Sequence, residues 1–214
     1  MSRIFLIRHG QTAMNIRHCL QGRTDTKLNE TGIRQAQGTR DFLKKEHLKA
    51  DVVYVSPLQR ARRTAEIVTG FSPEMCCVEP RLIEMSFGNF EGTEVEKMPE
   101  KARNELFRDP ASFGPYGDSE TVEEVIQRTT GFLAELSAGI RSGQLPDHPF
   151  CRTDEKEPGN IFLVSHGAAI HAMICGMKQM DPKDFWSFDI DNCALLEIFP
   201  EQRDCRVLFP GYHS

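Results

Sequence analysis

Two histidines follow nearly identical stretches of sequence, which makes them candidates for shared chemistry. Residues 4–10 read IFLIRHG and residues 161–167 read IFLVSHG, so that His9 and His166 occupy the same place in each stretch. Each run of four apolar residues is typical of a strand buried on both faces of a parallel sheet. Because parallel strands end at the same edge of a sheet, we expect the two histidines to lie close together.

An arginine is expected at the same edge. Residues 51–55 predict another strand, and Ser56 and Pro57 follow it directly. Serine is a frequent helix N-cap, and proline is common at the first helical position. We therefore predict a helix over 57–69, whose first turn would bring Arg60 to the end of the sheet.

These residue types are suited to the transfer of a phosphoryl group. A neutral imidazole is a good nucleophile, and a phosphohistidine divides one difficult hydrolysis into two easier steps. The planar guanidinium groups of Arg8 and Arg60 match phosphate oxygens in two-point contacts. Gly10 and Gly167 would let the backbone approach the anion and donate N–H groups to it. Since monoester hydrolysis is among the slowest uncatalysed reactions, a cluster of such donors is needed.

Either histidine taken alone has a simpler interpretation. Buried polar side chains are usually hydrogen-bonded parts of a core, so a single Arg-His-Gly sequence is weak support for catalysis. The repeated strand end, combined with Arg60, favours a catalytic site over this alternative.

Helical and strand patterns alternate along the remaining sequence, which predicts an α/β fold. Asn29 is a candidate N-cap for a helix over 30–47, and Ser119 is expected to begin a longer amphipathic helix. Residues 194–199 and 206–209 are expected to form a closing hairpin.

We expect a single domain over residues 1–214, with two cap or insertion segments. The segment 85–118 is rich in glycine, proline and charge, and predicts loops with short helices. The segment 141–160 is polar and contains several prolines, so we expect an exposed loop, either an insertion or a lid.

Composition excludes several classes of protein. The 26 Lys and Arg against 31 Asp and Glu leave a net charge of −5, which argues against non-specific nucleic-acid binding. No apolar run approaches the roughly 18 residues of a membrane span, and residues 1–10 lack the features of a signal peptide. The seven cysteines are odd in number and lack zinc-binding spacing, so we expect reduced thiols, a cytoplasmic location and no metal.

Further residues extend the pattern in one order along the chain: Leu6 to Thr12 with Asn15, Gln21-Gly22, Leu28-Asn29 with Gly32, Ser56 to Ala61 with Thr64-Ala65, Leu82, Glu84, Gly88, Phe90 to Gly92, and Val164 to Gly167. Over residues 4 to about 175 this set resembles the histidine phosphatase superfamily, phosphoglycerate mutase-like branch. The resemblance implies a three-layer αβα sandwich with a mostly parallel central sheet.

The resemblance also implies roles for individual residues. His9 would be phosphorylated, while Arg8, Arg60 and His166 would hold the phosphoryl group. The same pocket would be lined by Gly10, Thr12, Asn15, Gln21, Gly22 and Gly167. Glu84 would protonate the leaving oxygen and then activate water, a role that requires a carboxyl in a partly apolar cleft. Without the resemblance, Glu84 would be interpreted as a solvated loop carboxylate.

Three positions depart from the family pattern. His171 stands where many relatives have arginine, and we expect it outside direct contact with substrate. Arg63 stands where glutamine or histidine is frequent, and it either adds charge to the pocket or caps a helix. Gly117-Asp118-Ser119 resembles a Gly-Glu-Ser stretch with a shorter acid.

Three functions remain open at this point. The mutases of the family carry an adjacent arginine pair after the catalytic glutamate, and no such pair follows Glu84, which favours a phosphohydrolase. The alternative is a phosphoglycerate mutase, which alone would need 2,3-bisphosphoglycerate as a primer. A catalytically silent phosphate-binding module is the third reading.

The expected partner is a small phosphate ester, with no cofactor, nucleic acid or membrane, and the sequence leaves a homodimer open. Sugar phosphates, phosphoglycerates, nucleotides and a cobalamin-precursor phosphate are all candidates. Phe87, Phe90, Phe107, Phe113 and Tyr116 would either line the substrate pocket or form core. A nucleophilic His9 must be unprotonated, whereas a cationic His166 would help to hold phosphate, so we expect a bell-shaped or acid-shifted pH profile.

Overall fold

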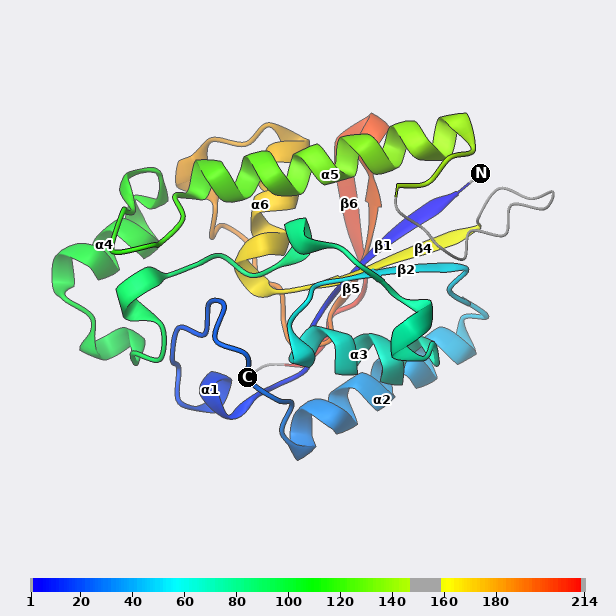
Figure 1. Ribbon diagram of the computed structural model, residues 1–214, viewed down its shortest axis with the longest axis horizontal. Helices are drawn as coiled ribbons and strands as arrows, with labels where there is room; N and C mark the ends of the chain where they lie inside the picture. The colour runs from blue at the N-terminus through cyan, green and yellow to red at the C-terminus, as the bar shows by residue number, and fades with distance from the viewer. Residues whose placement is uncertain (1, 147–158, 213–214) are drawn as a thin grey trace.

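The computed structural model describes residues 2–146 and 159–212, and it has the expected three layers. Figure 1 shows a central sheet with helices α5 and α6 on one side and α2 and α3 on the other. The four helices span Val122–Ser142, Gly167–Lys178, Glu30–Lys45 and Gln59–Thr69, in that order. The predicted αβα sandwich is thereby confirmed.

The sheet has six strands in the order β3-β2-β4-β1-β5-β6. The first four are parallel, and β5 and β6 form the expected antiparallel hairpin. Their bounds, in sheet order, are Cys77–Val78, Val52–Val55, Asn160–Ser165, Arg3–Arg8, Leu195–Phe199 and Asp204–Phe209. Arg8 pairs with Ser165 at the ends of β1 and β4, so His9 and His166 leave the sheet side by side.

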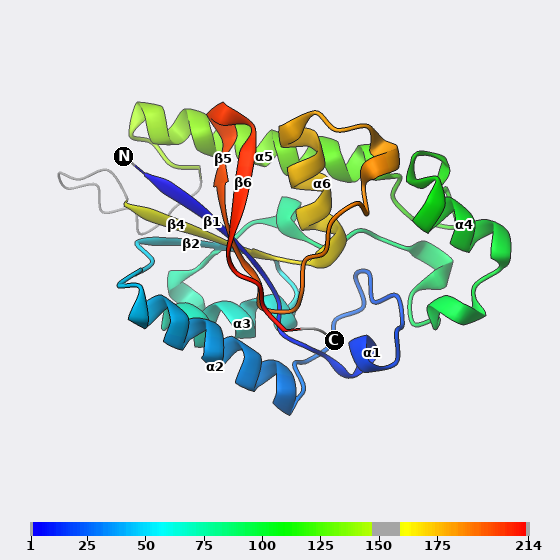
Figure 2. The same cartoon turned by 180° about the vertical axis from the view of Figure 1, so that it is seen from behind.

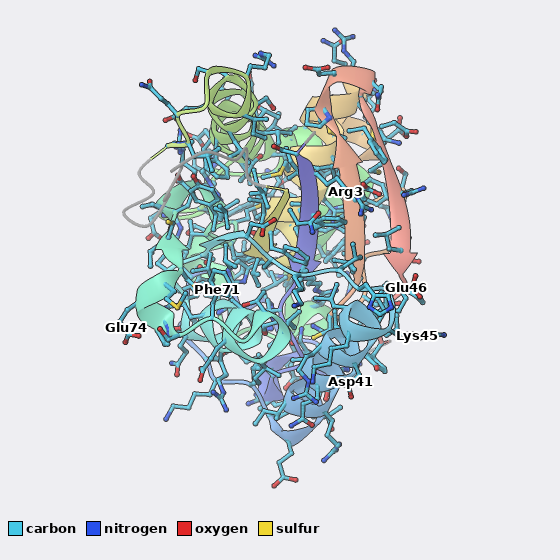
Figure 3. All side chains as sticks on the ribbon, turned by 90° about the vertical axis from the view of Figure 1, so that its right-hand side faces the viewer. Arg3, Asp41, Lys45, Glu46, Phe71 and Glu74 are labelled. Carbon is cyan, nitrogen blue, oxygen red and sulfur yellow. The ribbon has the colours of Figure 1, made fainter. Side chains whose placement is uncertain are left out.

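Alternate residues of the strands face different helix layers. Ile4 and Leu6 of β1 belong to the core beneath α5 and α6, whereas Phe5 and Ile7 belong to the core beneath α2 and α3. The helices of both layers bury apolar faces against the sheet. Figure 3 views this arrangement from the end where β1 begins, with Arg3 on the near side.

The segment 85–118 forms short helices, as predicted, and has its own small core. It contains α4 (Glu100–Arg108) and several 3₁₀ turns. Phe87 and Phe113 are buried in a cluster with the first turns of α5 and α6, so they belong to the core. Figure 1 and Figure 2 both place α4 on the same side of the molecule as the short helix α1 (Ala13–Ile16).

Several predicted boundaries are wrong by a few residues. The helix predicted over 57–69 begins at Gln59, and Ser56 is not its cap. The helix expected from Ser119 begins at Val122, because Thr121 forms a capping box with Glu124. Most of the segment 141–160, predicted as a loop or lid, lies outside the described residues.

No helix in the described part of the chain is long and apolar enough to cross a membrane.

Candidate active site

The two histidines and Arg60 meet at one buried point. Arg60 Nε donates to His9 Nε2 at 3.3 Å and to His166 Nδ1 at 3.2 Å. The two imidazole centroids are 5.0 Å apart, and all three side chains are at most 2% exposed. The predicted convergence of the strand ends and the first turn of α3 therefore exists in the structure.

The hydrogen bonds assign a tautomer to each ring. His9 Nδ1 lies 2.7 Å from the Gly10 carbonyl oxygen, which only accepts, so Nδ1 carries the proton and Nε2 has the lone pair. His166 Nδ1 accepts from Arg60, so its Nε2 carries the proton and donates to Ser56 Oγ at 2.6 Å. Ser56 thus orients His166 instead of capping a helix.

Both rings are expected to be neutral at neutral pH. Burial, and then the charges of Arg60 and Arg8, lower the pKa of His9 well below its usual value. Burial, followed by the charge of Arg60, lowers the pKa of His166 in the same way. This suits a nucleophilic His9, and a cationic His166 that holds phosphate stays a prediction.

Arg8 contributes a second guanidinium group, one of whose N–H donors is unpaired among the described residues. Its Nη1 donates to the Ile190 carbonyl oxygen, while its buried Nε has no hydrogen-bond partner among the described residues. A buried, unsatisfied cationic donor is costly, and an incoming phosphate oxygen would satisfy it. Gly167 lies beside Arg8, because a Cβ atom built on the glycine would be 3.6 Å from Arg8 Cζ.

Arg60 also holds the loop that carries Gln21 and Gly22. Its Nη1 and Nη2 donate to the carbonyl oxygens of Thr24 and Gly22, at 2.8 and 2.7 Å. Glu91 braces the same loop by accepting from the backbone N–H groups of Arg23 and Thr24. Gly22 has φ of +53°, and a Cβ atom there would fall 2.0 Å from Glu91 Oε1, so a larger residue would be strained and would displace the Glu91 carboxylate.

The side chain of Glu84, which belongs to a different segment, lies against the first turn of α6 and close to Arg8 and Arg60. Its Oε1 accepts from the backbone N–H groups of Met85 and Ala169, and its Oε2 accepts from that of Ala168. Met85 and Leu82 are fully buried beside it, while Glu84 itself is 8% exposed. The carboxylate is therefore a built part of the site, and the solvated-loop interpretation is wrong.

Side chains from other segments form hydrogen bonds with the backbone on both sides of Glu84. The Leu82 carbonyl oxygen accepts from Ser165 Oγ at 2.7 Å, and those of Arg81 and Ile83 accept from Arg128 Nη1. On the other side of Glu84, the Ser86 N–H donates to Glu120 Oε2 at 3.0 Å.

The remaining predicted pocket residues make contacts within the protein. The Gly10 N–H donates to Thr64 Oγ1, so it does not point freely toward an anion, and a Cβ atom on Gly10 would fall 2.5 Å from the Gly32 carbonyl oxygen. Close helix packing, and not anion binding, is therefore the visible reason for this glycine.

Thr12 and Asn15 form a reciprocal cap at the start of α1, and Thr12 Oγ1 also donates to Gln21 Oε1 at 2.9 Å. These residues shape the loop beside the histidines. Direct contact of Thr12, Asn15, Gln21 or Gly167 with a substrate stays a prediction.

The three departures from the family pattern lie outside the meeting point of the histidines. Arg63 is half exposed and pairs with Glu66 at 2.6 Å, so it serves the surface of α3. His171 Nδ1 and Nε2 lie 2.8 and 2.7 Å from the carbonyl oxygens of Gly167 and Phe188, within an aromatic cluster. Ser119 Oγ accepts from the Tyr116 N–H in a turn.

The residues that orient the catalytic side chains from distant parts of the chain were not identified from the sequence. Ser56, Arg128 and Glu120 act through contacts between distant segments. Asn192 Nδ2, from the segment that leads into β5 beside β1, donates to the His9 carbonyl oxygen at 2.9 Å. Only Ser56 had a signal, its place directly after a buried strand, and that signal was attributed to a helix cap.

A large cavity lies away from these residues. It has a volume of about 600 Å³ and opens beside Arg3, Ile140, Glu197 and Pro200 at the other end of β1. None of the predicted site residues lines it. The chemistry of the side chains, and not the size of a cavity, therefore locates the site.

Within the described residues, no group of three His, Cys, Asp or Glu side chains is placed to hold a metal ion.

Comparison with known proteins agrees with this geometry. A family model described as the histidine phosphatase superfamily (branch 1) matches residues 4–211. The chain is 31% identical over 214 residues to a putative phosphoserine phosphatase 2 of Hydrogenobacter thermophilus, covering 98% of this chain and 95% of that protein. It is 29% identical over 192 residues to the adenosylcobalamin/alpha-ribazole phosphatase of Escherichia coli, covering 89% and 86%.

A solved structure extends the likeness to three dimensions. The phosphoserine phosphatase of Entamoeba histolytica, crystallised with 3-phosphoglyceric acid, matches with a TM-score of 0.76 and 25% identity, covering 100% of this chain and 98% of that chain. The chain therefore belongs to the histidine phosphatase superfamily, branch 1.

Proposed function

We propose that this protein is a phosphomonoesterase that hydrolyses a small phosphorylated metabolite through a phosphohistidine on His9. One observation carries the proposal: the lone pairs of His9 and His166 converge on a single buried N–H of Arg60. A phosphoryl group that enters this point accepts from Arg60 and Arg8 and meets the lone pair of His9 Nε2.

The first step transfers the phosphoryl group to the protein. His9 Nε2 forms a bond to phosphorus as the bond from phosphorus to the ester oxygen breaks. Glu84 gives its proton to the leaving oxygen, so an alcohol departs instead of an alkoxide. The Gly10 carbonyl oxygen keeps the Nδ1 proton of His9 in place throughout.

The second step returns the protein to its starting state. Water attacks phosphorus, Glu84 accepts the proton of that water, and the bond from His9 Nε2 to phosphorus breaks. Inorganic phosphate leaves, and Glu84 is again protonated. Arg8 and Arg60 stabilise the charge on the phosphoryl oxygens in both steps.

We propose O-phosphoserine or a phosphoglycerate as the first substrates to test. The names of the relatives from Hydrogenobacter and Entamoeba support this choice. The lack of an adjacent arginine pair in 85–118 supports hydrolysis over a mutase reaction. Neither step requires a metal ion.

Phosphorus NMR tests the proposal directly. Purified protein is incubated with EDTA and either O-phosphoserine or 3-phosphoglycerate containing a trace of 2,3-bisphosphoglycerate, with His9→Ala protein as the control. We expect inorganic phosphate to accumulate with the unmodified protein and not with the control. A 2-phosphoglycerate signal without free phosphate would make the protein a mutase. Loss of turnover caused by EDTA would contradict the metal-independent steps.

A further inference from the structure

We infer that Arg128 and Glu120 are positioning residues that hold Glu84 where it exchanges a proton with the ester oxygen. This inference rests on the proposed role of Glu84. Neither residue contacts the histidines, and each acts on the backbone next to Glu84. Their ion pair connects α5 to both sides of the catalytic carboxyl.

Arg128 holds the side that precedes Glu84. Its Nη1 donates to the carbonyl oxygens of Arg81 and Ile83, at 2.7 and 2.8 Å. The Ile83 carbonyl belongs to the peptide bond that leads directly into Glu84. The Arg128 side chain is only 16% exposed, so these hydrogen bonds face little competition from water.

Glu120 holds the side that follows Glu84. Its Oε2 accepts from the Ser86 N–H, and its own N–H donates to the Ser86 carbonyl oxygen, both at 3.0 Å. Ser86 is thereby fixed through both of its backbone polar groups. Because Glu84 lies between Ile83 and Ser86, the backbone on both sides of it is fixed.

The two positioning residues form one unit. Arg128 Nε and Nη2 donate to the two carboxylate oxygens of Glu120, at 2.8 and 3.0 Å, a bidentate geometry that fixes both side chains. Burial opposes ionisation of Glu120, but the hydrogen bonds and charge of Arg128 outweigh it and lower the pKa of Glu120. The pair is therefore ionised at neutral pH.

Glu120 also reaches the other side of the site. Arg23 Nη2 lies 2.9 Å from Glu120 Oε1, and Arg23 adjoins Gly22, whose carbonyl oxygen binds Arg60. Arg23 is 44% exposed, and Glu91 and Arg60 hold the same loop through their own hydrogen bonds, so the loop stays supported when the Glu120 carboxylate is lost.

Loss of positioning has a specific kinetic consequence. An alkyl phosphate such as O-phosphoserine needs a proton on its leaving oxygen, whereas p-nitrophenyl phosphate releases a stable anion and does not. A displaced Glu84 therefore slows phosphorylation of His9 by the first substrate and spares the second. Displacement by about 1 Å can cost about 10²-fold in rate. General unfolding or loss of phosphate binding would slow both substrates equally.

Single-turnover rapid-quench experiments, with protein in excess, measure release of serine and of p-nitrophenol by Arg128→Met and Glu120→Gln. Glu84→Gln defines the full effect of losing the proton donor. We expect both positioning variants to lose about 10²-fold on O-phosphoserine and to stay within about threefold on p-nitrophenyl phosphate. Arg128→Lys, which keeps a donor and a charge, should recover part of the loss.

Arg81→Met is the matched control, because the Arg81 side chain pairs with two carboxylates, Glu79 and Glu135, and within the described chain it makes no hydrogen bond to residues 83–86. Its rates on both substrates should stay close to those of the unmodified protein. Equal losses on both substrates in Arg128→Met and Glu120→Gln would overturn the inference. Absence of turnover in the unmodified protein, or equal losses in Glu84→Gln, would instead overturn the proposed function.

Discussion

At the scale of single residues, the site is defined by which atoms donate and which accept. Arg60 has no acceptor, so its Nε–H forces lone pairs onto the facing nitrogens of His9 and His166. The Gly10 carbonyl and the Ser56 hydroxyl then hold the protons of the two rings on their far sides. The nucleophile is therefore prepared before any substrate arrives.

A pH titration tests this arrangement. Because the pKa values of His9 and His166 are lowered, both rings should stay neutral as the pH falls through their usual value of 6.5. We expect nitrogen NMR of labelled protein in phosphate-free buffer to show His9 protonated on Nδ1 and His166 on Nε2 at about pH 6. His9→Ala protein assigns the signals. An imidazolium signal from either ring at that pH would contradict the assignment.

At the scale of secondary-structure elements, α6 and Glu84 depend on each other. His166 is the N-cap of α6, but its side chain faces Arg60 and Ser56 and makes no cap hydrogen bond. The carboxylate of Glu84 takes that place by accepting from Ala168 and Ala169. One carboxyl from another segment therefore satisfies the helix terminus and belongs to the active site.

Helix α5 is stabilised differently, by a local cap. Thr121 Oγ1 accepts from the Glu124 N–H, and Glu124 in turn accepts from the Thr121 N–H. We expect Thr121→Ala to lower the free energy of unfolding by about 1 kcal/mol in urea denaturation. Ser137→Ala on the same helix is the control, because its hydroxyl only bonds the Leu133 carbonyl four residues back, and its effect should be smaller. An effect of Thr121→Ala no larger than that of Ser137→Ala would contradict a special stabilising role of the cap.

At the scale of the whole molecule, a site built for an anion should make the folded state more stable when an anion binds. Arg8 and Arg60 bring two guanidinium groups to the site, and Arg8 Nε lacks a hydrogen-bond partner among the described residues. A ligand that binds only the native state at 100 times its Kd adds about 2.7 kcal/mol. We therefore expect inorganic phosphate to raise the Tm more than sodium chloride of equal ionic strength does.

Variants of two arginines of α3 distinguish phosphate binding at the site from a general effect of phosphate on the Tm. Arg60→Met should lose most of the phosphate response, because Arg60 faces the histidines. Arg63→Met should keep the response, because Arg63 pairs with Glu66 on the surface. The same Tm shift in both variants would mean that phosphate acts elsewhere on the protein.

The sequence by itself determined the strands and the identity of the central residues. The repeated run of four apolar residues before His9 and His166 predicts two strands buried on both faces, and the structure pairs them as β1 and β4. The expected hairpin, helices and short helices of 85–118 followed from local periodicity and turn residues. The expected roles of His9 and Glu84 came from the family resemblance.

Only the tertiary structure decided the hydrogen bonds that orient these residues. Ser56 could be interpreted locally as a helix cap, but the approach of His166 from β4 gives its hydroxyl another partner. Arg128 and Glu120 have no local pattern, because they act on the backbone around Glu84, a distant segment. Periodicity records which face of an element is buried, whereas the direction of a buried hydrogen bond depends on which segments meet, and that is settled only when the chain folds.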